Sequence, residues 1–273
     1  MLHSAPPEGS GRTGRVTESD ERLIEAVVEI ALAAGRVIMA IYRGDFEVRA
    51  KADASPVTEA DEAAERLIVE RLRCLTPEIA VIGEEMVAQG RAPERLGQAF
   101  WLVDPLDGTK EFISRNGEFT VNIALIKDGQ PVLGVVNLPV RGLSYAAAGP
   151  GRAWRQKNGG PAKPIACRPL PADGAVVVAS RSHMTAATEA WLNTVKVASF
   201  AQAGSSLKFC LLAAGEADLY PRLGRTMEWD TAAGHAVLAA AGGSVETLDG
   251  QPLIYGKPGF ENPHFIARGR PAG

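Results

Sequence analysis

The chain has 273 residues, of which 46% are hydrophobic and 22% are charged, and its formal net charge is -3. These values are ordinary for a globular protein that buries a sizeable core, and they suit one large domain or two closely joined halves. The charge argues against a nucleic-acid surface, no apolar run reaches the roughly 18 residues of a membrane helix, and three scattered cysteines support neither a disulfide framework nor a zinc site.

The N-terminal part of the chain divides into a tail and a helix. Residues 1–17 are rich in Gly, Pro, Ser and Arg and lack an apolar segment, which predicts a disordered tail rather than a signal peptide. From Glu21 to Tyr42 apolar residues recur at helical spacing, which predicts a long amphipathic helix. A short strand is predicted from Phe46 to Ala50.

The next segment combines a helix start with two acidic positions. Thr58 to Asp61 has the pattern of a capping box, which predicts a helix that continues to about Leu75. Asp61 is then either a capping carboxylate or a catalytic one, and the spacing alone leaves both interpretations open. Ala80 to Gly83 is predicted to be a buried strand that ends at Glu84 and Glu85. On an extended chain adjacent side chains point to opposite faces, so only one of these two acids is expected to face a site.

The central segment is predicted to be a strand, a tight turn and a helix start. Phe100 to Val103 are four apolar residues in a row, as in a strand that is covered on both faces. Asp104 and Asp107 lie in the turn, and Thr109 is a plausible first-turn or N-cap residue of the helix. Carboxylates beside the free N–H groups of a helix start can hold a hard cation and a phosphate together. The alternative is an ordinary Asp-Pro and Asp-Gly turn without a site.

The rest of the chain predicts two kinds of supersecondary structure. Three consecutive strands are predicted at Phe119 to Lys127, Pro131 to Leu138 and Leu143 to Ala147. Gly149 to Pro171 is rich in Gly, Pro and Lys, with a short strand at Arg152 to Arg155, and is the predicted seam between two halves. Beyond it strands and helices alternate, which predicts layered α/β packing. The strands are expected at Ala175 to Ala179, Val197 to Ala201, Ala217 to Tyr220, Gly243 to Glu246 and Phe265 to Ala267, and the helices at Thr185 to Val195, Ser205 to Ala214 and Asp230 to Ala241.

Four motifs together resemble a known family. They are Asp61, the Gly-Glu-Glu of residues 83–85, the Asp-Pro-Leu-Asp-Gly-Thr of residues 104–109 and the Trp-Asp-Thr-Ala-Ala-Gly of residues 229–234. This set resembles the signature of the lithium-sensitive, magnesium-dependent phosphatases of the inositol monophosphatase superfamily, and the resemblance runs from about Ser19 to Arg268. Within the superfamily the chain is most similar to bacterial 3'(2'),5'-bisphosphate nucleotidases of the CysQ type, on the segments Asp104 to Leu125 and Gly204 to Cys210.

The resemblance implies a fold and a division of labour. The expected fold is α/β with mixed α+β layers, in the αβαβα sandwich of inositol monophosphatases and related sugar phosphatases. The N-terminal half, residues 18–155, is expected to carry the metal-binding motifs. The C-terminal half, residues 156–273, is expected to carry the nucleotide-binding residues.

The resemblance also assigns a metal centre. Four carboxylates must converge, and one pair at 4 Å repels by about 4 kcal/mol even at an effective dielectric of 20, so cations are needed among them. Oxygen ligands favour Mg²⁺ or Mn²⁺ over zinc. Two or three Mg²⁺ ions are implied, one on Glu84, Asp104 and the Leu106 carbonyl and another on Asp104, Asp107 and Asp230. Thr109, with Asp61 behind it and Glu84 beside it, is implied to activate the attacking water.

Substrate recognition is implied by residues of the second half. The implied substrate-binding set is Gly108, Thr109, His183, Ser205, Lys208, Arg222 and Asp230. Inositol monophosphatases carry Glu where this chain has Arg222, and a guanidinium is suited to a second phosphate. The expected reaction is removal of the 3'-phosphate of adenosine 3',5'-bisphosphate (PAP) to leave AMP, in sulfur assimilation or nucleotide recycling. Taken singly, Lys208 could equally be a solvated helix residue and His183 a loop cap.

Several alternatives stay open. Inositol 1-phosphate, fructose 1,6-bisphosphate and the sulfated nucleotide PAPS are other substrates within the same superfamily. Haloacid-dehalogenase-type phosphatases use Asp-x-Asp-Gly-Thr, but the two acids here are separated by one residue more than in that motif. A non-enzymatic regulator that binds a phosphate ligand is a third class. We expect a cytoplasmic enzyme with small-molecule partners, and leave open a homodimer and peripheral association with the inner membrane.

Overall fold

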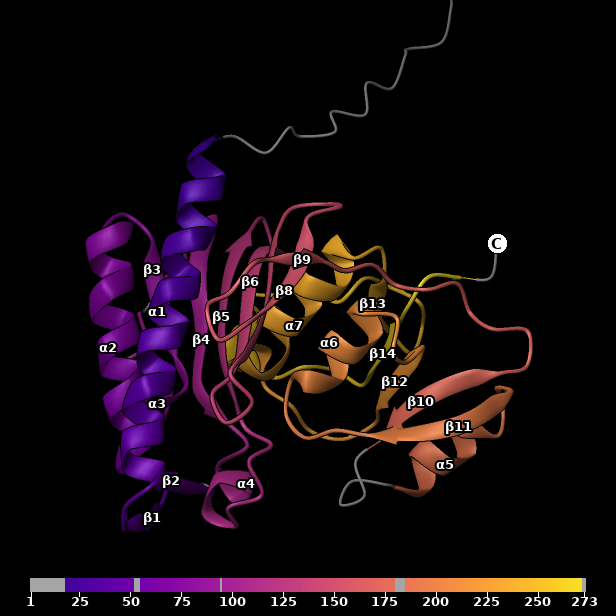
Figure 1. The fold of residues 1–273 in the computed structure, drawn as a ribbon, viewed down its shortest axis with the longest axis horizontal. Helices are drawn as coiled ribbons and strands as arrows, with labels where there is room; N and C mark the ends of the chain where they lie inside the picture. Colours follow the sequence, from indigo (N-terminus) through magenta and orange to yellow (C-terminus); the bar gives the residue numbers. More distant parts are fainter. Residues whose placement is uncertain (1–17, 52–54, 94, 180–184, 272–273) are drawn as a thin grey trace, which may run out of the picture.

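Two sheets and three layers of helices alternate through the molecule (Figure 1). The computed structural model describes residues 18–51, 55–93, 95–179 and 185–271. The predicted disordered tail, residues 1–17, therefore lies outside the described residues, as does His183. The layered arrangement confirms the predicted αβαβα sandwich.

The first layer is a pair of long helices. α1 (Glu18–Tyr42) begins at Glu18 rather than at the predicted Glu21, and α2 (Glu59–Leu75) has its predicted bounds. Their apolar faces cover one side of the larger sheet and share a core with Trp101 and Val103. The helical spacing of apolar residues in the sequence is thus explained by burial of one face of each helix.

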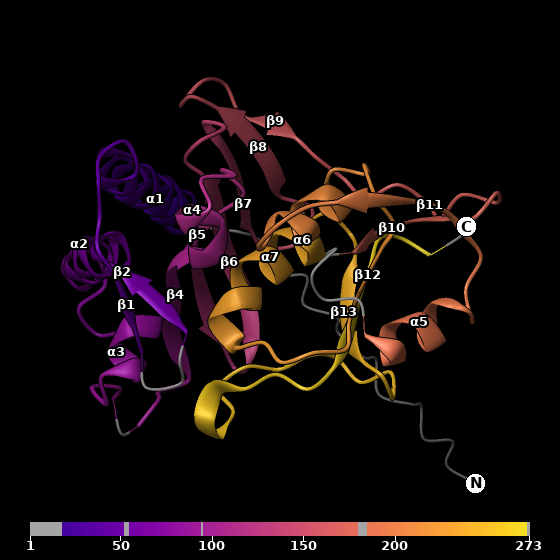
Figure 2. The same ribbon diagram turned by 90° about the horizontal axis from the view of Figure 1, so that it is seen from below.

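The larger sheet has seven strands in the order β3-β4-β5-β6-β7-β8-β9, and only the β3–β4 pair is parallel. The strands are β3 (Ala80–Gly83), β4 (Ala99–Asp107), β5 (Thr120–Lys127), β6 (Gln130–Leu138), β7 (Leu143–Ala148), β8 (Ala153–Lys157) and β9 (Lys163–Pro164). A separate hairpin, β1 (Val48–Ala50) and β2 (Pro56–Thr58), lies beside the short helix α3 (Glu84–Ala88) (Figure 2).

The central segment differs from its prediction. β4 continues through Asp104 to Asp107, and the expected tight turn is a bulge in this strand. Asp104 pairs with Asn122 and Asp107 with Thr120, so β4 holds one residue more than β5 across this stretch. Pro105 has no N–H to donate to the ladder, and this favours a bulge at its position. The helix that follows is α4 (Thr109–Ile113).

The second half adds the remaining layers. Its five strands have the order β11-β10-β12-β14-β13, and the helices α6 and α7 lie between the two sheets while α5 covers the outer face (Figure 1). The bounds are β10 (Ala175–Ala179), α5 (Ala186–Leu192), β11 (Val197–Gln202), α6 (Leu207–Ala213), β12 (Leu219–Arg222), α7 (Glu228–Ala240), β13 (Ser244–Thr247), the 3-10 turn η2 (Pro258–Phe260) and β14 (Phe265–Arg268). The predicted division of the chain at residues 155 and 156 stays a prediction.

Candidate active site

The bulge at the end of β4 carries two predicted metal ligands. Asp104 is 1% exposed, and its carboxylate accepts a hydrogen bond from the Leu106 N–H at 3.0 Å. Asp107 is half-buried, and its negative charge acts on Asp104. Gly108 follows with a φ of 97°, in the left-handed region that favours glycine. A Cβ at this position would also lie 2.4 Å from Ser205 Oγ, so only glycine lets the chain pass here.

Asp61 caps α2 and also contacts Thr109, the residue with which the sequence pairs it. One carboxylate oxygen accepts from the Thr58 N–H at 2.8 Å and from Thr58 Oγ1 at 2.7 Å, which completes the predicted capping box of α2. The other oxygen accepts from Thr109 Oγ1 at 3.1 Å. The capping interaction therefore holds the Asp61 carboxylate rigidly against the hydroxyl that the sequence pairs with it.

The sequence predicted that the two acids after β3 point to opposite faces, and this prediction is wrong. Glu84 and Glu85 each lie 2.6 Å from Lys51 Nζ. They belong to the first turn of α3 rather than to an extended strand, so their side chains are about 100° apart around the helix instead of about 180°, and both reach Lys51. Burial would lower the pKa of Lys51, but the charges of Glu84 and Glu85 raise it above its usual value.

The carboxylates of the site carry an excess of negative charge. Burial raises the pKa of Asp104 and of Asp230 well above the usual range, and the charges of Glu84 and Asp107 raise both further. Burial also raises the pKa of Asp107, while Lys208 acts in the opposite direction. In the described parts of the chain, no three His, Cys, Asp or Glu side chains are already arranged as a ligand set for a metal ion. Lys51 holds the Glu84 side chain, and the Met227 N–H donates to Asp230 at 2.8 Å.

The donor set nevertheless fits a hard divalent cation. Glu84, Asp104, Asp107 and Asp230 influence one another electrostatically, and all offer carboxylate oxygens. Lys51 acts against the negative charge around Asp104, Lys208 against that of Asp107 and Arg222 against that of Asp230. Carboxylate oxygens suit Mg²⁺ or Mn²⁺ better than softer metals, and a bound cation would remove the mutual repulsion of these side chains.

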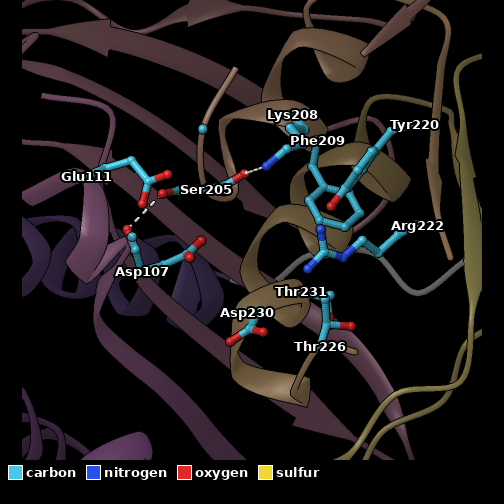
Figure 3. Close-up of a pocket in the computed structure, with 12 residues that line it drawn as sticks. Asp107, Glu111, Ser205, Lys208, Phe209, Tyr220, Arg222, Thr226, Asp230 and Thr231 are labelled. Carbon is cyan, nitrogen blue, oxygen red and sulfur yellow. Dashed lines mark hydrogen bonds between the residues drawn. The ribbon is translucent and has the colours of Figure 1, made fainter. Parts of the chain in front are cut away.

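A pocket of about 110 Å³ opens beside these carboxylates. It is bordered by Asp107, Gly108, Glu111, Gly204, Ser205, Lys208, Phe209, Tyr220, Arg222, Thr226, Asp230 and Thr231. Figure 3 shows the Lys208 amine and the Arg222 guanidinium reaching toward the same hollow as Asp107 and Asp230. One wall is therefore acidic and the other basic, an arrangement suited to a phosphate ester held next to a metal.

Two of the predicted substrate residues are cations of this wall, Lys208 being buried and Arg222 half-buried. Lys208 is 6% exposed and donates to the Ser205 carbonyl at 2.9 Å, so it is not a solvated helix residue. Burial lowers its pKa to about 8. Arg222 donates to the Arg225 carbonyl at 3.1 Å, while its buried Nε finds no hydrogen-bond partner among the described residues. Such an unpaired buried donor is costly, and a ligand oxygen would satisfy it.

Ser205 has a structural task in addition to its place in the pocket. Its hydroxyl lies 2.8 Å from the Asp107 carbonyl and 2.9 Å from the Glu118 carbonyl, and Figure 3 shows the first of these contacts. It therefore ties the start of α6 to the end of β4. Its contact with a substrate stays a prediction, as does that of His183.

Sequence reasoning missed several residues of the site. Lys51 stands alone after a short strand, and no spacing marks it. Ser206, directly after a predicted residue, donates to the Asp230 carbonyl at 2.6 Å and accepts from Asn122 Nδ2 at 2.9 Å. Glu65 accepts from the Glu85 N–H at 2.7 Å. Its position one turn after Asp61 on the same helix was the only available signal.

The chain is similar to curated proteins over most of its length. It is 50% identical over 246 residues to the 3'(2'),5'-bisphosphate nucleotidase CysQ of Escherichia coli K12, which covers 89% of this chain and 98% of the relative. It is 41% identical to the protein of the same name from Buchnera aphidicola, over 90% of this chain and 93% of that one. No helix in the described ranges is long and apolar enough to cross a membrane.

Solved structures agree with this similarity. CysQ from Bacteroides thetaiotaomicron, described as a bacterial member of the inositol monophosphatase family, matches with a TM-score of 0.76 and 39% identity, over 91% of this chain and 97% of that one. The inositol monophosphatase from Anabaena matches with a TM-score of 0.73 and 26% identity, over 92% and 91% of the two chains. The model of the inositol monophosphatase family matches residues 19–268. This chain belongs to the inositol monophosphatase family.

Proposed function

We propose that the chain hydrolyses the 3'-phosphate of PAP, releasing phosphate and AMP, with PAPS as a further substrate. The observation that carries the proposal is the pair of cations, Lys208 and Arg222, on the wall opposite Asp107 and Asp230. A monophosphate needs no second cationic position, whereas a bisphosphate does. The names of the relatives at 50% identity support the same substrate.

Arg222 is the proposed partner of the phosphate that is not cleaved. Its unpaired, buried Nε and its terminal nitrogens form a fork that can donate to two phosphate oxygens. Lys208 contributes a second positive charge from α6. Together they supply the charge that holds a doubly phosphorylated nucleotide across the pocket.

Glu84, Asp104, Asp107, Asp230 and the Leu106 carbonyl are the proposed ligands of two or three Mg²⁺ ions, which Mn²⁺ can replace. When bound, such ions act as Lewis acids and stabilise the attacking and leaving oxygens of a phosphoryl transfer. The protein's own contribution is the Thr109–Asp61 pair. Thr109 Oγ1 donates to Asp61 Oδ1, which leaves its lone pairs free to accept a proton from the attacking water. Burial raises the pKa of Asp61 against the opposing hydrogen bonds from Thr58, which makes it a stronger base.

Atoms balance in a single displacement. The water oxygen forms a bond to phosphorus, the bond between phosphorus and the 3'-oxygen breaks, and the 3'-oxygen leaves as an alcohol after it takes up a proton from solvent, to which Asp61 later releases the proton that it gains. The water proton passes to Thr109 as the Thr109 proton passes to Asp61. The backbone N–H groups of Gly108 and Thr109 are proposed to bind the phosphate oxygens during this step.

The test is phosphate release from PAP, inositol 1-phosphate and fructose 1,6-bisphosphate, measured with Mg²⁺ under identical conditions. The expected result is a clear preference for PAP and inhibition by Li⁺. A preference for inositol 1-phosphate would overturn the substrate assignment, and no turnover of any ester would favour a phosphate-binding regulator. We also propose a cytoplasmic location, to be tested by cell fractionation, and leave the oligomeric state to size-exclusion chromatography.

A further inference from the structure

Helix α3 lacks a side-chain cap of its own. Its N-cap position is Gly83, which has no side chain to accept from the first free N–H groups of the helix. They are the backbone N–H groups at the start of α3, on either side of the Glu84 Cα from which that side chain extends toward the proposed metal site. A group that accepts hydrogen bonds from these N–H groups therefore also fixes the backbone that positions the Glu84 carboxylate.

Glu65, on α2, supplies the missing cap from another part of the chain. Its carboxylate accepts from the Glu85 N–H at 2.7 Å, and the Met86 N–H is a second donor to it. Glu65 is only 5% exposed, so water does not compete for these bonds. Burial raises the pKa of Glu65 to about 7, against the effect of the two N–H groups.

Gly83 is the complement of this carboxylate. Its φ of -108° is available to any residue, so backbone conformation does not require glycine. Space does, because a Cβ at position 83 would lie 2.4 Å from Glu65 Oε2 and 2.5 Å from its Cδ. The pair therefore divides the work of an ordinary N-cap residue, with the glycine leaving room and the distant glutamate accepting the hydrogen bonds.

We propose that Glu65 is a positioning residue that caps α3 in place of a side chain at position 83 and thereby sets the position of the Glu84 carboxylate. The link to metal binding rests on the proposed function. Residues that orient a metal ligand without touching the metal typically contribute about 10- to 100-fold to metal affinity.

The experiment is a double-mutant cycle on the full chain. Glu65→Ala removes the cap, and Gly83→Ser introduces a Cβ that clashes with Glu65. The double variant Glu65→Ala/Gly83→Ser has both the space and a serine cap of its own. Each single variant is expected to lower Mn²⁺ affinity, measured by calorimetry, about 10- to 100-fold. Each should also lower the Tm measured in EDTA by about 2–8 °C, and the double variant should recover most of both losses.

The controls separate this cap from general damage. Glu65→Gln keeps an acceptor oxygen and should bind Mn²⁺ nearly as the parent does. Glu70→Ala, an exposed acid on the same helix, should change neither property. Losses that simply add in the double variant, or an unchanged Mn²⁺ affinity in Glu65→Ala, would overturn the proposal. Recovery in the Tm and in Mn²⁺ binding would uphold it even if PAP proved a poor substrate, while a parent that binds no Mn²⁺ would refute both the metal site and this positioning role.

Discussion

Arg222 borders the pocket from β12, where its guanidinium shares one hollow with Asp107 and Asp230. Arg222→Glu places a carboxylate where the second phosphate is expected, so repulsion adds to the lost bidentate contact. We expect kcat/KM for PAP to fall by about a hundredfold or more, since a reversed charge pair typically costs several kcal/mol. Steady-state kinetics with PAP and inositol 1-phosphate provide the measurement. An equal loss on both substrates would make Arg222 a structural residue.

Asp107, a proposed metal ligand, should respond differently, because a ligand of the metal would act on every substrate. Asp107→Asn removes one negative charge from the donor set without changing its shape. We expect kcat to fall by several orders of magnitude for PAP and for any side substrate alike. Measurement of kcat at saturating Mg²⁺ checks this expectation. A variant whose loss appears only in KM would argue that Asp107 binds substrate rather than metal.

Lys208 makes a pH dependence measurable. Burial lowers its pKa to about 8, with Arg222 acting in the same direction and Asp107 against it. As the pH rises through about 8, the ammonium loses its charge, so kcat/KM for PAP should decline. Lys208→Met should be less active throughout and should lack this decline. A parent profile that stays level from pH 7 to 10 would contradict the role of the Lys208 charge.

The lowered pKa of Lys208 also affects stability, and here a rise in pH is favourable, whereas it is unfavourable for activity. The folded-state pKa of Lys208 lies below its unfolded value of 10.5, so burial of the charged amine is unfavourable below about pH 8. Between about pH 8 and 10.5 the unfolded chain binds more protons than the folded one. The contribution of Lys208 to the free energy of unfolding therefore rises with pH in this window. The measurement is urea unfolding of the parent and of Lys208→Met at several pH values in this window. The difference between their free energies of unfolding gives the contribution of Lys208.

At the scale of elements, one hydroxyl joins a strand and two helices. Ser206, at the N-cap position of α6, donates to the Asp230 carbonyl in α7 at 2.6 Å and accepts from Asn122 in β5 at 2.9 Å. It is 1% exposed, so water cannot replace either bond. Ser206→Ala should lower the free energy of unfolding by about 1–3 kcal/mol, the usual cost of leaving buried polar groups unpaired.

Denaturant unfolding and phosphate release measure the two effects of this change. Because Asp230 lies in the first turn of α7, a shift of that turn should also reduce activity. Ser244→Ala is the matched control, since the half-buried Ser244 hydroxyl donates to Glu246, a half-buried neighbour two residues away. If Ser206→Ala were as stable and active as the control, the three elements would not depend on this hydroxyl.

At the scale of the whole molecule, α7 lies between the two larger sheets and packs against the seven-stranded one (Figure 1). Gly134 in β6 lets the helix approach closely, because a Cβ there would lie 2.5 Å from the Ala233 carbonyl oxygen and 2.7 Å from the Ala236 Cβ. Gly134→Ala should lower the free energy of unfolding by about 1–3 kcal/mol through overpacking. Gly224→Ala is the control, since a Cβ there would meet nothing within 4 Å. Equal stability of the two variants, measured by urea unfolding, would refute the close approach.

Local sequence determined most of the elements. The apolar spacing of α1, the capping box of α2 and the alternating strands and helices of the second half all reflect interactions between residues a few positions apart. Such interactions can be read from spacing because helix and strand geometry is periodic. The motifs of the site were recognisable for the same reason, since Asp104, Asp107 and Thr109 lie within one short segment.

Tertiary structure alone decided how those motifs are held. Lys51 reaches the two acids of α3 across 33 residues in its bond to Glu84, and Glu65 caps the same helix from 20 residues away. The bulge of β4 depends on its register with β5, which spacing within β4 does not reveal. Contacts of this kind have no period in the sequence, because they depend on which surfaces the fold brings together. The sequence therefore predicted which carboxylates lie together at the candidate site, whereas the residues that orient them were identified only from the tertiary structure.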